Sequence, residues 1–552
     1  MEFHFATAWE AIADAIPDVP ALTCGEVTRS WRAYDERAAR LASALRAAGL
    51  GAGSRVGIYL RNSNEYLEAQ FAAFKTGGCA VNIDCRHKAD ALVQLLDHAA
   101  VEALVYQSCH AARIWEIQKR VPSVKCFIEV ADGTENIPVK GRLDYETAIR
   151  EQPPLARSGD RRADDPWVLL TAGSNGSPKG VIHANGALCE AFVTAALRAH
   201  GMDPPGQLSG LADVVRSLVA SGQRPVSLPV APLTHRTGLW LGAMVPLLAG
   251  GTVVTIPGGA VDPDLIWDEV RAHRVTDIAI AGDAHAKPLL AALDMAARQG
   301  RPYDLSSLRR MVSSGVMWSA EVRRRLLAHH DMMLCDVLAT AAGLLGGSVS
   351  TRAHVVATAT FTAGPGVKVC ADDGLEVGPG SGEVGEIASS GTVPVGHLED
   401  TAQAAATLRD VDGVRHAFTG DLARVDAQGS ITLLGRAAAC IDIAGEQVFL
   451  SEIEEVVKLH PLVLDCIVIG HVQPPAQGET GAAVQVIALA AMDEDELEDA
   501  TATAAAILQF TRARVRGSRY PARMLLVPEI RRSMNGKPDY GWARQEVTSQ
   551  LH

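Results

Sequence analysis

A stretch of small polar residues at 171–180 has the composition of a phosphate-binding loop. It reads Thr-Ala-Gly-Ser-Asn-Gly-Ser-Pro-Lys-Gly and follows an apolar run at Val168–Leu170 that predicts a β-strand. Glycines let backbone N–H groups approach a polyphosphate, hydroxyls can donate to its oxygens, and a lysine adds positive charge. No Gly-Lys-Ser/Thr closes the stretch, so it is not a Walker A loop, and a polar surface loop is the alternative. The residues that we expect to contact phosphate are Thr171, Ser174, Asn175, Gly176 and Lys179.

The elements expected around this loop alternate between helix and strand. Apolar residues recur at helical spacing in 31–50, and a strand-like run follows at 56–60. The same order recurs with a helix at 266–273 before a strand at 277–281. This alternation predicts an α/β fold with parallel-rich sheets covered by helices. Ligands of such sheets bind in loops at the carboxyl ends of the strands.

The composition of the sequence and the pattern of expected elements change twice toward the C-terminus. From about residue 364 glycine and valine become frequent and the expected strands shorten, which predicts a small β-rich subdomain over about 364–435. A new α+β pattern then begins. We therefore predict a large N-terminal domain over 1–435 and a small mobile α+β domain over 436–552, with a hinge near 435–442.

Three local patterns carry further structural predictions. The run Arg323–Arg325 lies in a helix-like stretch and is expected to face solvent. Ser451 with Glu454 three residues later is a capping-box pattern for a helix start. The segment Gly238–Val261 has no formal charge and is long enough to span a bilayer, but a proline and a Gly-Gly pair favour a buried helix followed by a buried strand.

Composition restricts the class of protein. The chain has 552 residues, 48% of them hydrophobic, and a net charge of -13, which argues against a basic surface for nucleic acid. Ten cysteines are scattered without a CxxC pair, as is typical of buried thiols in a reducing compartment. No signal peptide is recognisable at the N-terminus. We expect a soluble cytoplasmic protein that acts on a small molecule, while its oligomeric state stays open.

Five further motifs place the chain beside a known superfamily. Together with the 171–180 stretch they resemble, in order and spacing, the motifs of the adenylate-forming superfamily, which includes acyl-CoA synthetases, peptide-synthetase adenylation domains and luciferases. The resemblance covers about residues 8–545, and the texture of 302–322 is similar to that of acyl-CoA synthetases for sterol side chains and fatty acids. The motifs are Pro-Leu-Thr-His-Arg-Thr-Gly at 232–238, Thr-Gly-Asp at 419–421, Gly-Arg at 435–436, the segment 441–454 and Asn-Gly-Lys at 535–537.

The resemblance implies an enzyme that uses ATP and Mg²⁺. Such enzymes join an oxyanion substrate to AMP, release pyrophosphate and pass the substrate to a second nucleophile, for which CoA is a candidate. It implies that Lys537 is the catalytic lysine, which bridges the oxyanion and the α-phosphate. It also implies that His235 lies in the wall of the reacting pocket. The remaining nucleotide contacts are expected from Ser314, Gly315, Asp336, Thr340, Asp421 and Arg436.

One motif of the superfamily is altered in this chain. Where relatives carry Tyr-Gly-x-Thr-Glu, whose Glu binds magnesium, residues 336–343 read Asp-Val-Leu-Ala-Thr-Ala-Ala-Gly, with Ala342 at the Glu position. Mg²⁺ often keeps waters and binds through phosphates, so the ligands of the metal ion stay open. Near the hinge, Ala438 and Asp442 also depart from the pattern, and the domain rotation between half-reactions can therefore differ.

The expected substrate pocket departs from one for a long apolar acid. Arg236 stands where a small residue is usual, and His285 and Lys287 stand where an aromatic or apolar residue and an arginine are common. A buried arginine without a partner is costly, so Arg236 in the pocket would hold a carboxylate that is not itself activated. The alternative is an Arg236 that faces solvent or pairs with a neighbour.

Three functions are compatible with these patterns. The first is an acyl- or aryl-CoA synthetase. The second is an ATP-dependent diazotase, which adenylates nitrite for attack by an aromatic amine in natural-product biosynthesis and which suits a polar pocket with Arg236. The third is a non-catalytic relative that binds ATP or AMP, as the missing Glu suggests, although the retained Lys537, Asp421 and Lys179 argue against it.

Overall fold

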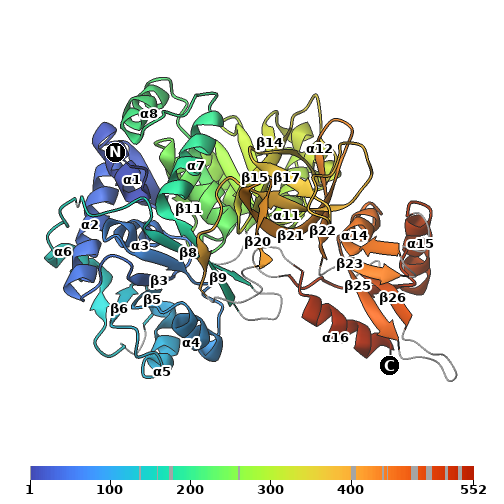
Figure 1. Ribbon diagram of the computed structural model, residues 1–552, viewed down its shortest axis with the longest axis horizontal. Helices are drawn as coiled ribbons and strands as arrows, with labels where there is room; N and C mark the ends of the chain where they lie inside the picture. The colour runs from blue at the N-terminus through green and yellow to red at the C-terminus, as the bar shows by residue number, and fades with distance from the viewer. Residues whose placement is uncertain are drawn as a thin grey trace.

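The structure is a computed structural model, and its described residues fall into twelve ranges. They are 2–135, 139–157, 159–172, 178–258, 262–398, 406–437, 440–443, 446–473, 483–492, 500–515, 520–532 and 538–551. For a few strand residues, Thr171 and Lys179 among them, only the backbone is described. Figure 1 shows a large N-terminal part of sheets and helices and a smaller C-terminal part beside it, with the two termini far apart along the long axis.

The first sheet of the N-terminal part has five parallel strands in the order β4-β3-β5-β6-β7. Its strands are β3 (Arg55–Tyr59), β4 (Cys79–Asn82), β5 (Ala103–Gln107), β6 (Cys126–Val130) and β7 (Leu143–Asp144). Its helices are α2 (Trp31–Ala47), α3 (Asn64–Lys75), α4 (Ala89–His98), α5 (Ala111–Ile117) and α6 (Tyr145–Glu151). Helix α3 is buried along nearly its whole length, and Ser63 caps it by accepting the N–H of Tyr66.

The second sheet is larger, and its middle strands position the candidate site. They run parallel in the order β11-β10-β12-β13-β14. Every residue of β11 and β12 is buried, as is typical of parallel strands covered on both faces. The carboxyl ends of β10, β12, β13 and β14 therefore meet at one edge. The parallel strands are β10 (Val226–Pro229), β11 (Thr252–Thr255), β12 (Asp277–Ile280), β13 (Arg310–Ser314) and β14 (Met333–Thr340), and β1 (Pro20–Cys24) and β2 (Val27–Ser30) extend the sheet beyond β11.

The remaining helices of the N-terminal part lie around these two sheets (Figure 1). They are α1 (Phe5–Ala15), α7 (Asn185–Arg198), α8 (Leu211–Ala220), a π-helix (Thr237–Met244), α9 (Val245–Leu248), α10 (Pro263–Ala272), α11 (Gly282–Arg298) and α12 (Ala320–His329), with short 3₁₀ turns at Ser108–His110 and Leu208–Gly210. The predicted α/β fold with parallel-rich sheets is confirmed by this arrangement.

The β-rich region predicted over about 364–435 continues the second sheet instead of forming a separate one. Strand β16 pairs with β15 on one side and with β22 on the other. The region nevertheless has its own apolar core, which includes Val369, Ile387 and Ile431. Its strands are β15 (Gly343–Ser350), β16 (Thr360–Ala363), β17 (Val367–Cys370), β18 (Gly385–Ser389), β20 (Leu408–Val411), β21 (Val414–Val425) and β22 (Ile431–Arg436).

A third sheet frames the stretch that resembles a phosphate loop. Strands β8 (Pro166–Ala172) and β9 (Pro178–Ala184) form an antiparallel pair, and β19 (Gly396–His397) joins β9. The backbone of Thr171 pairs with that of Lys179 in this ladder. The two strands thus bring both ends of the stretch together.

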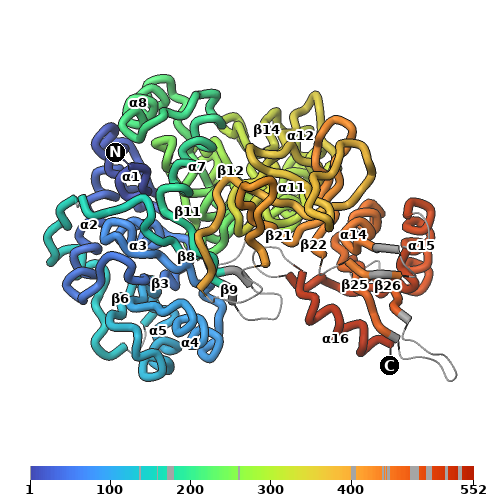
Figure 2. The backbone as a smooth tube through the Cα atoms, viewed as in Figure 1, coloured from blue at the N-terminus to red at the C-terminus, as the bar shows by residue number. Residues whose placement is uncertain are grey.

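The C-terminal part has two small sheets and two apolar cores of its own. Residues of β25 alternate between the cores: Cys466 and Val468 pack with α14 and α15, whereas Ile467 and Ile469 pack with α16. Figure 2 shows the backbone of this part beside β21 and β22. Its elements are β23 (Cys440–Ile443), β24 (Glu446–Phe449), β25 (Asp465–Gln473), β26 (Ala483–Ala491), β27 (Arg523–Val527), α14 (Leu450–Lys458), α15 (Ala500–Arg512) and α16 (Tyr540–Leu551).

The capping box predicted at the start of α14 is wrong. The helix begins at Leu450, one residue before Ser451, and no side chain caps it. The hydroxyl of Ser451 donates instead to the carbonyl of Leu434 in β22, and Glu454 accepts the N–H of Val468 in β25. Both side chains therefore join the helix to neighbouring strands, because packed partners were nearer than the helix's own backbone.

The prediction for the arginine run holds for only part of it. Arg323 is fully buried and donates to Ser350 and to the carbonyl of Val356, whereas Arg324 and Arg325 lie at the surface. The uncharged segment after Gly238 forms a buried helix and then β11, as predicted. Within the described ranges, no helix combines the length and apolar character needed to cross a bilayer.

Candidate active site

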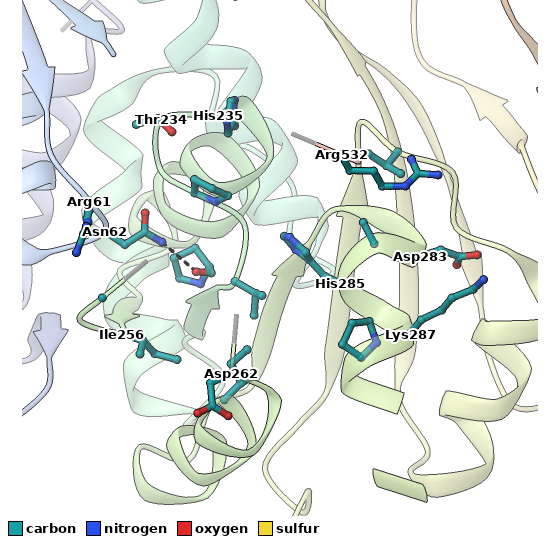
Figure 3. Close-up of a pocket in the computed structure, with 18 of the residues that line it drawn as sticks. Arg61, Asn62, Thr234, His235, Ile256, Asp262, Asp283, His285, Lys287 and Arg532 are labelled. Carbon is teal, nitrogen blue, oxygen red and sulfur yellow. Dashed lines mark hydrogen bonds between the residues drawn. The ribbon is translucent and has the colours of Figure 1, made fainter. Parts of the chain in front are cut away.

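A cavity of about 970 Å³ lies at the carboxyl ends of β10 and β12 and extends to the C-terminal part of the chain. Figure 3 shows His285 directed into it, with Asn62 on one side and Asp283, Lys287 and Arg532 on the other. Asn62 follows β3, His285 lies in the first turn of α11, and Arg532 comes from the C-terminal part. The volume suits a small-molecule ligand, and the lining combines apolar with charged side chains.

His235 lies in the wall of this cavity, in the turn that follows β10. The carbonyl of Pro232 accepts the N–H of His235 at 3.0 Å. The Nε2 atom of His235 lies 3.6 Å from Oδ2 of Asp84, which also pairs with Arg86. Burial alone would raise the pKa of Asp84, but His235 and Arg86 outweigh it and hold this pKa well below its usual range. An ionised carboxylate therefore borders His235.

The opposite end of the cavity is closed by contacts between the two parts of the chain. The ammonium group of Lys287 donates to the carbonyl oxygen of Leu464, and burial lowers the pKa of Lys287. Arg532 donates two hydrogen bonds to Asp465. Lys287 and His285 both line the cavity, but Lys287 already joins α11 to the C-terminal part.

Arg236 was expected to line the substrate pocket, but it is not among the residues that line this cavity. It has helical dihedral angles and immediately precedes the π-helix Thr237–Met244. His235 lines the cavity and Arg236, the next residue, does not. Its guanidinium lies over the ring of Trp240 at 5.8 Å from the centroid. Arg236 therefore does not meet the condition for holding a substrate carboxylate in this cavity, which was that it face the pocket.

Two neighbouring strand ends carry predicted nucleotide contacts. Ser314 ends β13, and Gly315 follows with a φ of +82°, a conformation that suits glycine. The hydroxyl of Thr237 donates to the carbonyl of Ser314 at 3.1 Å, which connects the turn after β10 to this strand end. Thr340 ends β14, where its hydroxyl accepts the N–H of Ala342 at 3.0 Å.

Asp336 is a buried carboxyl group in β14. Burial raises the pKa of Asp336 to about 7, although the charge of Arg323 opposes the shift. Asp336 is paired in register with Ser313, one residue before the end of β13. An ionised Asp336 could accept from an adenine amino group, and its raised pKa implies that this ability increases toward neutral pH.

We expect Asp336 to make the stability of the protein depend on pH. An aspartate in the unfolded chain releases its proton near pH 4, and Asp336 in the folded chain releases it near pH 7. The stabilisation is therefore complete below pH 4 and is lost as the pH rises through 7. Between pH 5 and pH 8 the wild type should lose up to about 3 kcal/mol relative to Asp336→Asn in denaturant titrations. Parallel pH profiles for the two proteins would contradict this assignment.

Asp421 and Arg436 lie opposite each other in β21 and β22. They are paired in register, with 3.3 Å between Nε of Arg436 and Oδ1 of Asp421. Gly420 has a φ of +77° and donates its N–H to Glu386 at 2.7 Å. The N–H of Asp421 donates to the hydroxyl of Thr419 at 3.1 Å. These bonds fix the backbone of the Thr-Gly-Asp segment within β21.

Several predicted residues cannot be placed. Arg532 and Pro538, which flank the Asn-Gly-Lys motif, form an isolated β-bridge, and Arg532 lines the cavity. The predicted residues outside the described ranges are Ser174, Asn175, Gly176, Ala438 and Lys537, and the side chains of Thr171, Lys179 and Asp442 are likewise not described.

Comparisons with known proteins identify the family. Residues 9–394 match the family model described as AMP-binding enzyme. The chain belongs to this family. It is 32% identical over 568 residues to a 3-oxocholest-4-en-26-oate–CoA ligase from Rhodococcus rhodochrous, a match that covers 99% of this chain and 96% of the relative. It is also 32% identical over 560 residues to a medium/long-chain-fatty-acid–CoA/3-oxocholest-4-en-26-oate–CoA ligase from Mycolicibacterium smegmatis, covering 100% and 97%.

Solved structures share the fold of this AMP-binding enzyme. The anthranilate CoA ligase AuaEII in complex with anthranoyl-AMP matches with a TM-score of 0.81 at 19% identity, covering 100% of this chain and 98% of that one. ATP-bound MatB from Rhodopseudomonas palustris matches with a TM-score of 0.79 at 22% identity over 100% of both chains. The predicted membership of the adenylate-forming superfamily is confirmed, and the chain is an adenylate-forming enzyme similar to CoA ligases.

The described residues of this AMP-binding enzyme do not fit a magnesium ion held by a cluster of protein side chains. No group of three or more His, Cys, Asp or Glu residues among them is placed to hold a metal ion. Ala342, which is buried, stands where the superfamily pattern has its metal-binding Glu. An ion that binds through nucleotide phosphates and waters does not require this carboxylate.

Three residues of the site were missed by the sequence analysis. Asp84 had a usable signal, because it comes two residues after β4, near the carboxyl end of a parallel strand. His183 in β9 contacts the carbonyl oxygen of Ala341 through Nε2 at 2.7 Å, and no local pattern indicates this contact. Arg532 lies five residues before Lys537 and reaches the cavity only through packing of the C-terminal part.

Proposed function

We propose that this AMP-binding enzyme is an AMP-forming CoA ligase, which joins a carboxylic acid to AMP and then transfers the acyl group to the thiol of CoA. The observation that carries this proposal is the segment that follows β10. It connects the cavity to the end of β13, where nucleotide contacts are predicted. His235 in this segment lines the cavity, and Thr237 donates to the end of β13. Similarity to CoA ligases over nearly the whole chain supports the same reaction.

The first step requires two anions to meet. A carboxylate oxygen attacks the α-phosphorus of ATP, and the bond from this phosphorus to pyrophosphate breaks as the new one forms. Fixed donors and cations must neutralise the charge, because water cannot reorganise freely in a closed site. We assign the ribose to Asp421 with Arg436 beside it, the adenine to Asp336, and charge neutralisation to Lys537.

The second step uses the thiol of CoA. Its thiol loses its proton to solvent as the sulfur attacks the activated carbonyl carbon, the bond from this carbon to the phosphate oxygen breaks, and AMP leaves. We propose that the part over 436–552 moves relative to 1–435 between the steps. Gly435 supports a pivot here: its φ is +125°, and a Cβ at this position would lie 3.0 Å from Oγ of Ser451.

We further propose that the acid carries a polar group. The cavity wall contains Asn62, the ionised Asp84 and His235. Asn62 already bonds to backbone groups and Asp84 bonds to Arg86. A long alkyl chain would nevertheless place the charge of Asp84, and Nε2 of His235, which has no hydrogen-bond partner among the described residues, in apolar surroundings, at about 1–3 kcal/mol for each buried group. An aryl or other compact acid with a hydroxyl, amino or carboxylate substituent would satisfy them. The sterol and fatty acids in the names of the relatives are therefore not our first choice.

Pyrophosphate release tests the proposed function. Purified protein with ATP and Mg²⁺ is assayed against a panel of aryl, hydroxy, amino and long-chain acids, with and without CoA. We expect acid-dependent release of pyrophosphate and a CoA thioester that mass spectrometry detects, with polar aryl acids giving higher kcat/KM than long-chain acids. A preference for long-chain acids would contradict the substrate class but leave the reaction standing.

The same assay decides between the proposal and the other two functions. Release that requires nitrite plus an aminoaryl acid, with no turnover on any acid alone, would establish a diazotase and remove the ligase. None of the relatives or solved structures named above is called a diazotase. Failure to release pyrophosphate under every condition would favour a protein that only binds the nucleotide.

A further inference from the structure

Arg236 is a half-buried arginine to which the proposed reaction assigns no role. Its Nη1 atom is buried and has no hydrogen-bond partner among the described residues. Contact with the ring of Trp240 holds the guanidinium but gives Nη1 no acceptor. A buried guanidinium with a free donor is costly unless an anion reaches it.

The surroundings of Arg236 place it beside the candidate nucleotide site. Burial lowers the pKa of Arg236 to about 10; the charge of Arg436 adds to this effect and that of Asp421 opposes it. Asp421 itself pairs with Arg436 at 3.3 Å, so its charge is already shared. Arg236 thus lies within electrostatic range of the residue that we assign to the ribose, and it does not line the acid cavity.

A second contact places Arg236 close to the altered motif. His183 contacts the carbonyl oxygen of Ala341, between Thr340 and Ala342. Burial lowers the pKa of His183 to about 4, and the nearby charge of Arg236 contributes to the shift. The guanidinium therefore lies near the turn from β14 to β15. This is the turn at which the chain has alanine in place of a carboxylate.

We propose that Arg236 binds the α-phosphate of the nucleotide and supplies fixed positive charge at the turn where this chain lacks a metal-binding carboxylate. The proposal deepens the proposed function and rests on it for the identity of the nucleotide. A guanidinium can donate two parallel hydrogen bonds to a phosphate group. In relatives with the Glu, a metal ion held by that carboxylate would instead coordinate the phosphate. A glutamate at position 342 would neutralise the charge of Arg236. This accounts for the joint occurrence of two departures from the superfamily pattern, Arg236 in place of a small residue and Ala342 in place of the Glu.

A binding experiment separates this role from catalysis. Calorimetric titration measures the affinity of the full-length protein for AMP and for adenosine, which differ only in the phosphate, with no acid substrate present. We expect Arg236→Met to weaken AMP binding by about 10- to 100-fold and to leave adenosine binding unchanged, as for the loss of one charge-assisted hydrogen-bonded pair. Arg236→Lys should lose less affinity for AMP, because lysine keeps the positive charge but lacks the two parallel N–H donors of the guanidinium.

The control is Arg415→Met, which removes an exposed arginine of β21 and should leave both affinities unchanged. If Arg236→Met does not fold, Arg236→Gln gives the same comparison with a polar side chain in the buried position. Equal losses for AMP and adenosine, or no loss for either, would overturn the proposal. These outcomes are independent of whether any acid is activated.

A second arm tests the source of the charge. We expect removal of divalent cations with EDTA to leave the affinity of the wild type for AMP within about twofold, since the guanidinium acts without a metal. If EDTA weakened AMP binding by tenfold or more while Arg236→Met had no effect, a metal ion and not Arg236 would hold the phosphate. ATP is not used in this arm, because its β- and γ-phosphates bind Mg²⁺ in solution.

Discussion

Lys537→Ala is expected to lower the rate of acid-dependent pyrophosphate release by about 10²–10³-fold, the effect of removing one fixed donor from developing charge. The described residues on either side support this expectation. Arg532 and Pro538 pair as a β-bridge, and Arg532 lines the cavity beside Asp465. The lysine between them thus belongs to a segment whose ends lie at the rim of the site.

Nucleotide binding distinguishes a catalytic lysine from a structural one. The affinity of Lys537→Ala for ATP should stay within a few-fold of the wild type, because Asp421 and Asp336 are assigned to the nucleoside. Lys119→Ala, which removes an exposed lysine after α5, serves as the matched control and should be fully active. Normal turnover by Lys537→Ala would show that another group neutralises the attacking oxyanion.

Gly238→Ala is expected to destabilise the protein by about 2–4 kcal/mol and to abolish pyrophosphate release. A Cβ on Gly238 would lie 2.3 Å from the carbonyl oxygens of both Ala231 and Pro232. Backbone atoms cannot move aside as the end of a side chain can, so the turn itself must shift. His235 and Thr237, which this turn directs toward the cavity and toward β13, would be displaced with it.

The matched control for this prediction is Gly378→Ala. No heavy atom lies within 4 Å of a Cβ at Gly378, and its φ is not in the left-handed region. The control should keep the thermal unfolding midpoint and the activity of the wild type. If Gly238→Ala unfolded at the same temperature as the wild type and stayed active, the close approach at the turn would not constrain the site.

Buried strands could be predicted from local sequence, because a strand that is covered on both faces consists of nearly continuous apolar residues. The runs at 56–60 and 277–281 are apolar with little alternation, and both form parallel strands flanked by helices. The β-rich region from residue 364 was predicted from its short apparent strands. The sequence did not indicate that this region continues the large sheet. That continuity depends on pairing between β16 and β22, which are far apart in the chain.

The candidate site residues could be predicted from the sequence where they belong to short motifs. Thr419–Asp421 lies in β21 with one local bond, from the N–H of Asp421 to the hydroxyl of Thr419, and Ser314 with Gly315 stands at a strand end. The motifs located these residues, whereas the bonds of Thr419 and Gly420 to Ile387 and Glu386 depend on the pairing of β18 with β21. Lys537 and the 173–177 stretch rest on the motif alone, since they lie outside the described residues.

The directions of long polar side chains came only from the folded chain. Arg236 and His235 are adjacent in sequence, yet only His235 lines the cavity, at the point where the turn after β10 passes into a helix. Lys287 meets Leu464, and Ser451 meets Leu434, through packing of the C-terminal part on the rest of the molecule. Residue types and spacing thus determine the family and the reaction class, whereas contacts between distant elements determine which polar side chains line the cavity and which do not.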